Sequence, residues 1–446
     1  MHARPAQLRT RNFCPPTWAH GALLVGAVGA VLFHIFVVPF GAQHWGLFNN
    51  MLDVNVYAAG GLAVLENRTL YAGPVYGPMP FTYPPFSALL FTGLALMDQT
   101  VLQILWTVAT VAALYATVVL CWKSLGYRIG QSLLLAAVPM TIIATVLEPV
   151  RTTLWYGQIN IFLMLLIVWD LTRPQGGLLR GIGVGIAAGI KLTPGFFFVY
   201  LALTRQWRTL YVSIVALLGT IVVAAAVIPR DSWTFWRGTL FESERIGQIN
   251  APANQSITGV LAQIFNTTEP PKAIVGIVTL AVLVLALVAI WLAHRADQHL
   301  LAITLAGLTA SMVSPFSWGH HWVWFVPLII ALCHYAVLSQ RLWVWSAPVL
   351  VALPVLCWVQ VFTDPTQPSG RFYAIGTFML LPPDAELVLL VRSAFPGTML
   401  IVTLTTIAVL GWRELGRTQR AHRLETNTAL LVAAHQPETA SGAMIK

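Results

Sequence analysis

The residue whose setting most clearly indicates chemistry is Asp53. It lies in the run from Met51 to Gly61, just after the first long apolar stretch, among apolar and aromatic neighbours. A carboxylate that is poorly hydrated can have its pKa tuned by its surroundings. We therefore expect Asp53 to act as a general base that takes a proton from a hydroxyl group. The alternatives are a helix cap or an ion pair with Arg68.

Aromatic and amide side chains form a second group of candidates. Tyr83 belongs to an aromatic, proline-rich run at residues 71–85, and flat aromatic faces stack on sugars or anchor a chain at a membrane interface. Gln158 and Asn160 enter an apolar run, where paired amide donors and acceptors suit sugar hydroxyls, although they could also begin a helix. Glu148 and Arg151 are spaced to pair with each other on one helix face.

Basic side chains inside apolar runs form the third group. Lys191, in Lys-Leu-Thr-Pro, is costly at membrane depth and needs an anion, for which a lipid phosphate or a buried carboxylate would serve. His320 and His321 point about 100° apart on a helix, so they rarely share a metal, but one could bind a phosphate oxygen or a sugar. Arg245 lies near Glu242 in a polar segment that either shapes an acceptor pocket or forms a solvated face.

The composition determines which kind of chain must position these groups. Of 446 residues, 57% are hydrophobic and 9% are charged, which leaves too few charges to cover a water-facing surface. This excludes a soluble enzyme and predicts an all-α polytopic membrane protein. The net charge of +9 is scattered over loops and forms no stripe, so we expect no nucleic acid partner. No dense acidic cluster or Cys/His metal motif is visible, so we expect no cofactor and no metal.

Two apolar runs are interrupted in ways that affect the topology. Residues 85–122 are broken near 98–100 and are interpreted as two helices with one net crossing. Residues 181–203 are broken at 191–194, and each half spans about 15 Å, half a membrane. We expect a re-entrant hairpin there, which is tolerated only where it lines a cavity. The other apolar runs are 18–40, 130–147, 159–171, 210–228, 273–293, 300–313, 322–338, 342–362 and 391–412.

The basic residues predict the orientation. The short loops assigned to the cytoplasm hold about twice as many Lys and Arg residues as the longer outer segments, which places both termini in the cytoplasm. The sequence thus predicts one integral membrane domain at 1–412 and a basic, polar cytoplasmic tail at 413–446. Three long outer segments, 41–84, 229–272 and 363–390, are where we expect the extracytoplasmic active site.

Taken together, these stretches resemble the GT-C class of lipid-linked-sugar glycosyltransferases. More narrowly, the chain is similar to the actinobacterial polyprenol-phosphate-mannose-dependent α-(1→2)-mannosyltransferases of phosphatidylinositol mannoside synthesis. The resemblance spans residues near 50 to 325 and is carried by Asp53 with Tyr57, Tyr83-Pro84-Pro85, Gly157-Gln158-Ile159-Asn160, Lys191-Leu192-Thr193-Pro194, and Ser314 to His321 with Trp318.

The resemblance implies a fold of about a dozen membrane helices, with broken ones among them. It implies a multi-pass enzyme of the plasma (inner) membrane that transfers mannose with inversion from polyprenyl-phosphate-mannose to a mannosylated phospholipid. Asp53 would be the base. The donor phosphate would be bound by His321, His320, Lys191 and Arg151, and the substrates by Tyr57, Tyr83, Glu148, Gln158, Asn160, Trp318 and Arg245.

Two other functions are open at this point. A polyprenyl-phosphate arabinofuranosyltransferase would use the same kind of donor, and the residues do not identify the sugar. A lipid or solute transporter would show internal repeat symmetry, which we do not find in this sequence.

Overall fold

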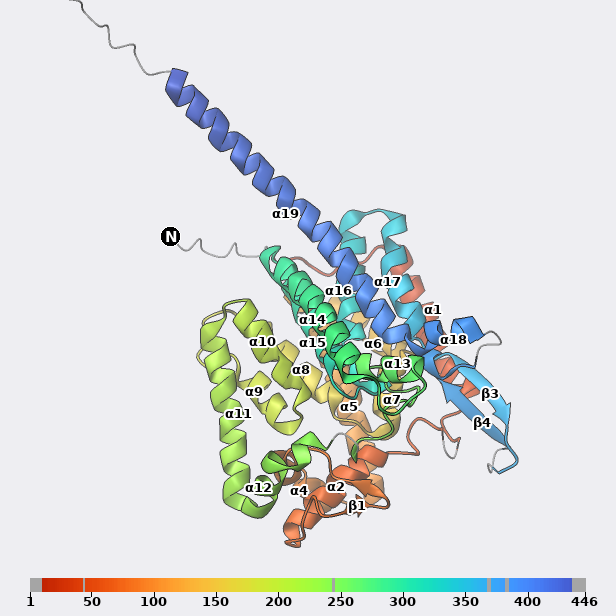
Figure 1. Ribbon diagram of the computed structural model, residues 1–446. Coiled ribbons are helices and arrows are strands. Elements are labelled where there is room, and N and C mark those ends of the chain that lie inside the picture. The colour runs from red at the N-terminus through yellow and green to blue at the C-terminus, as the bar shows by residue number, and fades with distance from the viewer. Residues whose placement is uncertain (1–9, 43–44, 243–244, 367–369, 382–384, 435–446) are drawn as a thin grey trace, which may run out of the picture.

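The computed structural model describes residues 10–42, 45–242, 245–366, 370–381 and 385–434. The chain is mostly helical (Figure 1). The first half contains α1 (Thr17–Leu32), η1 (Phe33–Val37), α2 (Leu52–Leu65), β1 (Pro74–Tyr76), β2 (Met79–Pro80), α3 (Pro85–Leu90), α4 (Thr92–Ala95), α5 (Gln99–Ser124), α6 (Gln131–Ala144), α7 (Glu148–Tyr156), α8 (Asn160–Leu171), α9 (Ile182–Ile190), η2 (Thr193–Gly195), α10 (Phe196–Leu203) and α11 (Trp207–Val227).

The second half continues the helical pattern. It contains α12 (Pro229–Arg237), η3 (Thr239–Phe241), α13 (Ile257–Ile264), α14 (Lys272–Arg295), α15 (His299–Val313), η5 (Gly319–Trp322), α16 (Phe325–Ser339), η6 (Leu342–Trp345), α17 (Ser346–Ala352), η7 (Leu353–Val355), β3 (Val359–Thr363), β4 (Arg371–Ile375), η8 (Thr377–Met379), α18 (Ala385–Arg392) and α19 (Ala394–Ala434). The predicted tail at 413–446 therefore begins inside the long helix α19.

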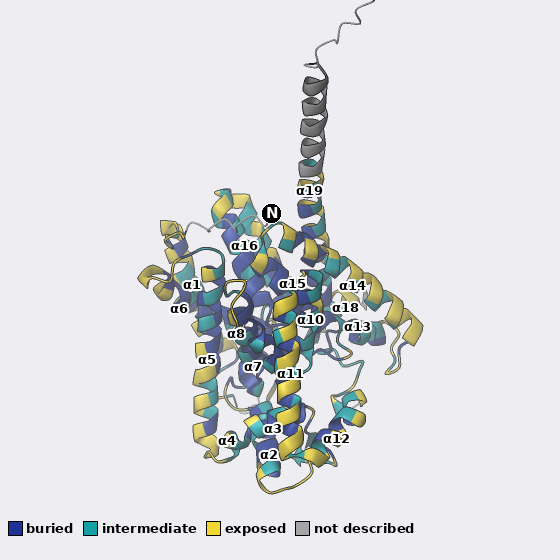
Figure 2. Ribbon diagram, turned by 90° about the vertical axis from the view of Figure 1, so that its left-hand side faces the viewer, coloured by how far each residue is buried: buried dark blue, intermediate teal, exposed yellow. Residues whose placement is uncertain are grey.

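Six helices among the described residues are long and apolar enough to cross a membrane. They are Thr17–Val37, Gln99–Ser124, Trp207–Val227, Lys272–Arg295, Gly319–Ser339 and Ala394–Gly416, and the bent pair α7–α8 makes up to seven. Exposed residues run along α5 and α11 (Figure 2), and large apolar ones such as Val108 and Leu218 are among them. Apolar side chains in that position suit lipid rather than water. The chain is a multi-pass membrane protein, whereas a total of about a dozen membrane helices stays a prediction.

The chain is mostly helical, as the predicted all-α class requires, and two small hairpins interrupt the helices. The strands β1 and β2 form one small antiparallel hairpin, and β3 and β4 form another. The run at 342–362, predicted as one apolar span, is helical only to Val355. Its end, Val359–Thr363, is rich in β-branched and aromatic residues, which favour a strand.

The expected break near residue 98 is confirmed. The helix α5 begins after Asp98, whose carboxylate accepts hydrogen bonds from the backbone N–H groups of Thr100 (2.9 Å) and Val101 (3.3 Å). These bonds satisfy two of the N–H groups that every helix start leaves unpaired.

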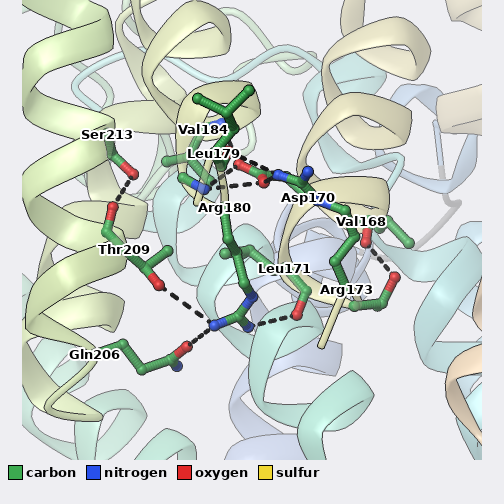
Figure 3. A network of polar contacts seen from close by, with 12 residues as sticks. Val168, Asp170, Leu171, Arg173, Leu179, Arg180, Val184, Gln206, Thr209 and Ser213 are labelled. Atoms are coloured by element: carbon green, nitrogen blue, oxygen red, sulfur yellow. Dashed lines mark hydrogen bonds and ion pairs between the residues drawn. The ribbon is translucent and has the colours of Figure 1, made fainter. Parts of the chain in front are cut away.

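The segment expected to form a re-entrant hairpin folds back on itself through α9, η2 and α10, and its place in a membrane stays a prediction. Arg180, just before α9, donates to the Gln206 side chain (2.6 Å), just after α10, and to the Leu171 carbonyl (2.7 Å) (Figure 3). Because residues on both flanks of the hairpin touch, the segment enters and leaves at the same level. At its tip Lys191 adopts an extended backbone that ends α9.

Two fixed contacts hold this hairpin in place. The buried Asp170 carboxylate accepts from the N–H groups of Gly181 (2.9 Å) and Val184 (3.1 Å) at the start of α9, and it pairs with Arg173. Farther along α9, a side chain at Gly189 would place its Cβ 2.2 Å from the hydroxyl of Thr220 on α11. The helices α9 and α11 can therefore lie this close only with glycine at that position.

We expect Asp170→Ala to destabilise the protein by about 1–3 kcal/mol, because it leaves two buried helix-start N–H groups and the partly exposed Arg173 without their acceptor. The measurement is the thermal unfolding midpoint in detergent, followed by tryptophan fluorescence. Glu269→Ala, which changes an exposed carboxylate far from this network, is the control. An Asp170→Ala protein as stable as this control would show that the network does not hold the hairpin.

Candidate active site

A cavity of about 750 Å³ collects most of the residues predicted from the sequence. It is enclosed by α2, α7, the tip of the α9–α10 hairpin, η5 and the segment after α12. All but two of the predicted site residues line it: Asp53, Tyr83, Glu148, Arg151, Gln158, Lys191, Arg245, Trp318, His320 and His321. Tyr57 and Asn160 lie directly behind this lining and bind residues that form it.

Asp53 lies in the first turn of α2, at the edge of the cavity. The start of α2 is fixed to α7, since the Met51 N–H donates to the Trp155 carbonyl (2.8 Å). Burial raises the pKa of Asp53 to about 7, although a hydrogen bond from Gln158 and the charge of Lys191 act in the opposite direction. The carboxylate is therefore poised to exchange a proton near neutral pH.

Neither alternative interpretation of Asp53 is supported. The N-cap position of α2 is held by Met51, and Asp53 stands inside the first turn. Arg68, the suggested ion-pair partner, binds Glu66 at 2.6 Å in an exposed pair.

Gln158 is held in one orientation by two tyrosines. The Tyr57 hydroxyl donates to Gln158 Oε1 (2.9 Å), and the Tyr83 hydroxyl lies 3.3 Å from the same oxygen and 2.9 Å from that of Tyr57. With its oxygen occupied, the amide directs its N–H group to Asp53. Gln158 stands at the break between α7 and α8, where the axis turns by 119°.

On the other side of the same break, Lys191 and the neighbouring His320 and His321 form a positively charged cluster, which we call the Lys191–His321 pole. Its Nζ donates to Asn160 Oδ1 (2.9 Å) and to His321 Nε2 (3.1 Å), and Asn160 Nδ2 in turn donates to the His320 carbonyl (2.8 Å). Among the described residues no carboxylate lies within ion-pair distance of Lys191.

The bond from Lys191 defines the state of the neighbouring imidazole. An ammonium can only donate, so His321 Nε2 must accept and the proton of the neutral ring lies on Nδ1. That Nδ1 and His320 Nε2 are buried and have no hydrogen-bond partner in the described part of the chain. The pole therefore offers a charge and the free N–H group of His321 Nδ1, both suited to an anion.

Glu148 and Arg151 do not form the ion pair that their spacing suggests. Arg151 Nη2 instead donates to the Trp45 carbonyl (2.6 Å), and the described residues show no ion pair between the two side chains. The Glu148 carboxylate packs against the backbone of Gly319. Arg245 donates to the Tyr71 carbonyl (2.9 Å) and to Glu242 (3.2 Å) at the cavity wall.

Neither Trp45 nor Trp155 was singled out from the sequence as a site residue. Their rings stack at 4.9 Å with an interplanar angle of 23°, and both line the cavity. A tryptophan in the first outer segment could have been noticed as a candidate for sugar binding. Nothing in the sequence spacing, however, indicates that residue 45 contacts residue 155.

Within the described residues no group of three or more His, Cys, Asp or Glu side chains is arranged to hold a metal ion. Metal-independent catalysis stays a prediction.

A multi-pass helical protein whose cavity brings together a buried carboxylate and a cationic pole fits an integral membrane transferase. Residues 81–315 match the model of glycosyltransferase family 87. The chain belongs to this family, and the resemblance predicted from the sequence is confirmed.

Two curated relatives are similar over most of the chain, and both are described as polyprenol-phosphate-mannose-dependent alpha-(1-2)-phosphatidylinositol pentamannoside mannosyltransferase. The protein of Mycobacterium tuberculosis is 37% identical over 339 residues, 74% of this chain and 75% of the relative. The protein of Mycolicibacterium smegmatis is 32% identical over 423 residues, 93% of this chain and 94% of the relative. No solved structure matches the chain.

We expect Gly319→Ala to disturb the cavity, because its Cβ would lie 2.5 Å from Glu148 Oε2. Such overpacking costs about 1–3 kcal/mol. The unfolding midpoint of Gly319→Ala should fall, and adding Glu148→Ala should restore part of the loss. Gly195→Ala is the control, since its Cβ would have no neighbour within 4 Å. Equal midpoints for the two alanine variants would contradict the close packing.

Proposed function

We propose that the chain is an inverting mannosyltransferase that uses polyprenyl-phosphate-mannose as donor and extends a phosphatidylinositol mannoside through an α-1,2 linkage. The observation that carries this proposal is the cavity shared by Asp53 and the Lys191–His321 pole. A base and an anion site are the two groups that displacement of a lipid phosphate by a hydroxyl requires. The names of the family 87 relatives supply the sugar and the acceptor.

The proposed reaction uses Asp53 as the base. Its carboxylate takes the proton of the acceptor 2-hydroxyl while the acceptor oxygen forms a bond to the anomeric carbon. The bond from this carbon to the phosphate oxygen breaks on the opposite face, and its electron pair leaves with the lipid phosphate. A transition state of this kind is oxocarbenium-like.

Lys191, His321 and His320 are proposed to bind the donor phosphate. The negative charge on the leaving oxygen grows in the transition state, and donors that are already in place stabilise it without reorganising. No carboxylate of the described residues lies within ion-pair distance of Lys191, and the charge of Asp53 acts on it from farther away, so a phosphate in the cavity would compensate its charge best.

The remaining predicted residues have supporting roles in this proposal. Gln158, held by Tyr57 and Tyr83, steadies the Asp53 carboxylate. Asn160 holds Lys191 and the backbone at His320. Trp318 and Arg245 line the acceptor side of the cavity.

The proposed location is the outer face of the plasma membrane, with both termini in the cytoplasm. In support, α2 and α12 gather at one end of the helix bundle, while α19 extends from the other end (Figures 1 and 2). The basic residues of the loops predict that the end with α2 is outside.

We expect Asp53→Asn to lower the rate of mannosyl transfer by about 10²–10⁴-fold, because the amide cannot accept the proton. Donor binding should persist. The measurement is transfer of radiolabelled mannose by protein reconstituted in liposomes, with Asp297→Asn as the control for an aspartate outside the cavity. Near-normal turnover by Asp53→Asn would remove Asp53 from the base role.

The pH dependence follows from the raised pKa of Asp53. The ionised carboxylate is the active form, so the rate should fall as the pH drops below about 7. The bond from Gln158 favours the ionised form, and Gln158→Leu should therefore raise the pKa and move this acidic limb to higher pH. The measurement is the kcat/KM profile of both proteins. If kcat/KM of Gln158→Leu falls at the same pH as that of the wild-type protein, or at a lower pH, the hydrogen bond from Gln158 to Asp53 does not stabilise the ionised carboxylate.

A further inference from the structure

We propose that the cavity contains a second sugar subsite, formed by Glu148, Arg151 and the stacked rings of Trp45 and Trp155. This subsite would hold the acceptor hexose next to the one that reacts. The inference rests on the proposed function and gives Arg151 a role different from the donor-phosphate binding predicted from the sequence.

Arg151 is the first argument for a ligand at this place. The side chain is 0% exposed and lines the cavity, and one of its nitrogens, Nη2, donates to the Trp45 carbonyl. The other two, Nε and Nη1, have no hydrogen-bond partner among the described residues. Unsatisfied donors on a buried guanidinium are costly, so a ligand that accepts hydrogen bonds is expected beside them.

Glu148 determines what kind of ligand this is. Its carboxylate lies one helical turn before Arg151, is 2% exposed, and has no partner for Oε2 in the described part of the chain. A pair of neighbouring sugar hydroxyls can hydrogen-bond to the Glu148 carboxyl group and accept from Arg151, so the two residues together fit a neutral carbohydrate.

The aromatic pair supplies the wall of the subsite. Trp45 and Trp155 both face the cavity, and their stacked rings make a broad apolar surface on which the C–H face of a sugar can pack. Trp45 is also held from behind, since its ring meets that of Phe372 on β4 edge-on at 5.0 Å. The β3–β4 hairpin thus supports the subsite.

The position along α7 separates the subsite from the reacting centre. Glu148 begins α7 and Tyr156 ends it, an axial separation of about 12 Å at 1.5 Å per residue. Asp53 lies near the far end, where Gln158 reaches its carboxylate. In this proposal, the sugar bound at Glu148 is the neighbour of the sugar whose hydroxyl reacts at Asp53, which fits an acceptor that already carries more than one sugar.

The test compares acceptors with one and two sugars. With reconstituted protein and polyprenyl-phosphate-mannose, Arg151→Gln and Glu148→Gln should raise the KM for octyl α-1,2-mannobioside by about tenfold or more. The KM for octyl α-mannoside, and that for the donor, should stay within about twofold. Arg68→Gln and Glu66→Gln, an exposed pair outside the cavity, are the matched controls.

Three results would overturn the subsite: equal losses with both acceptors, a raised donor KM, or no change in either variant.

A binding measurement without donor separates the subsite from the proposed function. The mannobioside should raise the unfolding midpoint of the wild-type protein and not that of Arg151→Gln, whether or not transfer occurs. A wild-type protein that binds the mannobioside but transfers no mannose would refute the function and keep the subsite, and equal midpoint shifts in both proteins would refute the subsite.

Discussion

The structure depends on one electrostatic constraint, a lysine ammonium held at the tip of a broken hairpin inside a helical membrane protein. Lys191 has an amide oxygen and an imidazole nitrogen as its partners, and no carboxylate among the described residues lies close enough to form an ion pair. A cation in that setting is tolerated where it faces a polar cavity and has an anion to bind. The cavity, the hairpin and the proposed phosphate site all follow from this placement.

A single break in the chain serves both halves of the proposed chemistry. The axis turns by 119° between α7 and α8, and Gln158 and Asn160 stand on either side of the turn. Gln158 directs its amide to Asp53, and Asn160 holds Lys191. Two side chains only two residues apart therefore position Asp53 and Lys191, and a shift of this segment would displace both. At the other end of the hairpin, Asp170 and Arg180 prevent such a shift of Lys191.

Features that depend only on residues close together in the sequence were predictable. The break at Asp98, the interruption at Lys191 and the crossing by long apolar helices follow from a capping residue, a Lys–Pro interruption and hydropathy. The residues carrying the family resemblance also gather at one cavity, although their roles stay predictions.

Features that depend on distant partners were not predictable. Arg151 and Glu148 are correctly spaced for an ion pair, yet Arg151 binds the carbonyl of Trp45, 106 positions away. The β3–β4 hairpin was taken for the end of a membrane helix because a short apolar run fits either structure. Helical spacing describes which side chains can meet on one helix, but not which of them tertiary packing brings to another segment.

The most direct test of the account is a structure of the protein with polyprenyl-phosphate-mannose bound. The account predicts the phosphate within hydrogen-bond distance of Lys191 Nζ and His321 Nδ1, with the anomeric carbon facing the Asp53 side of the cavity. A phosphate bound at Arg151, or a mannose with its anomeric carbon turned away from Asp53, would contradict it.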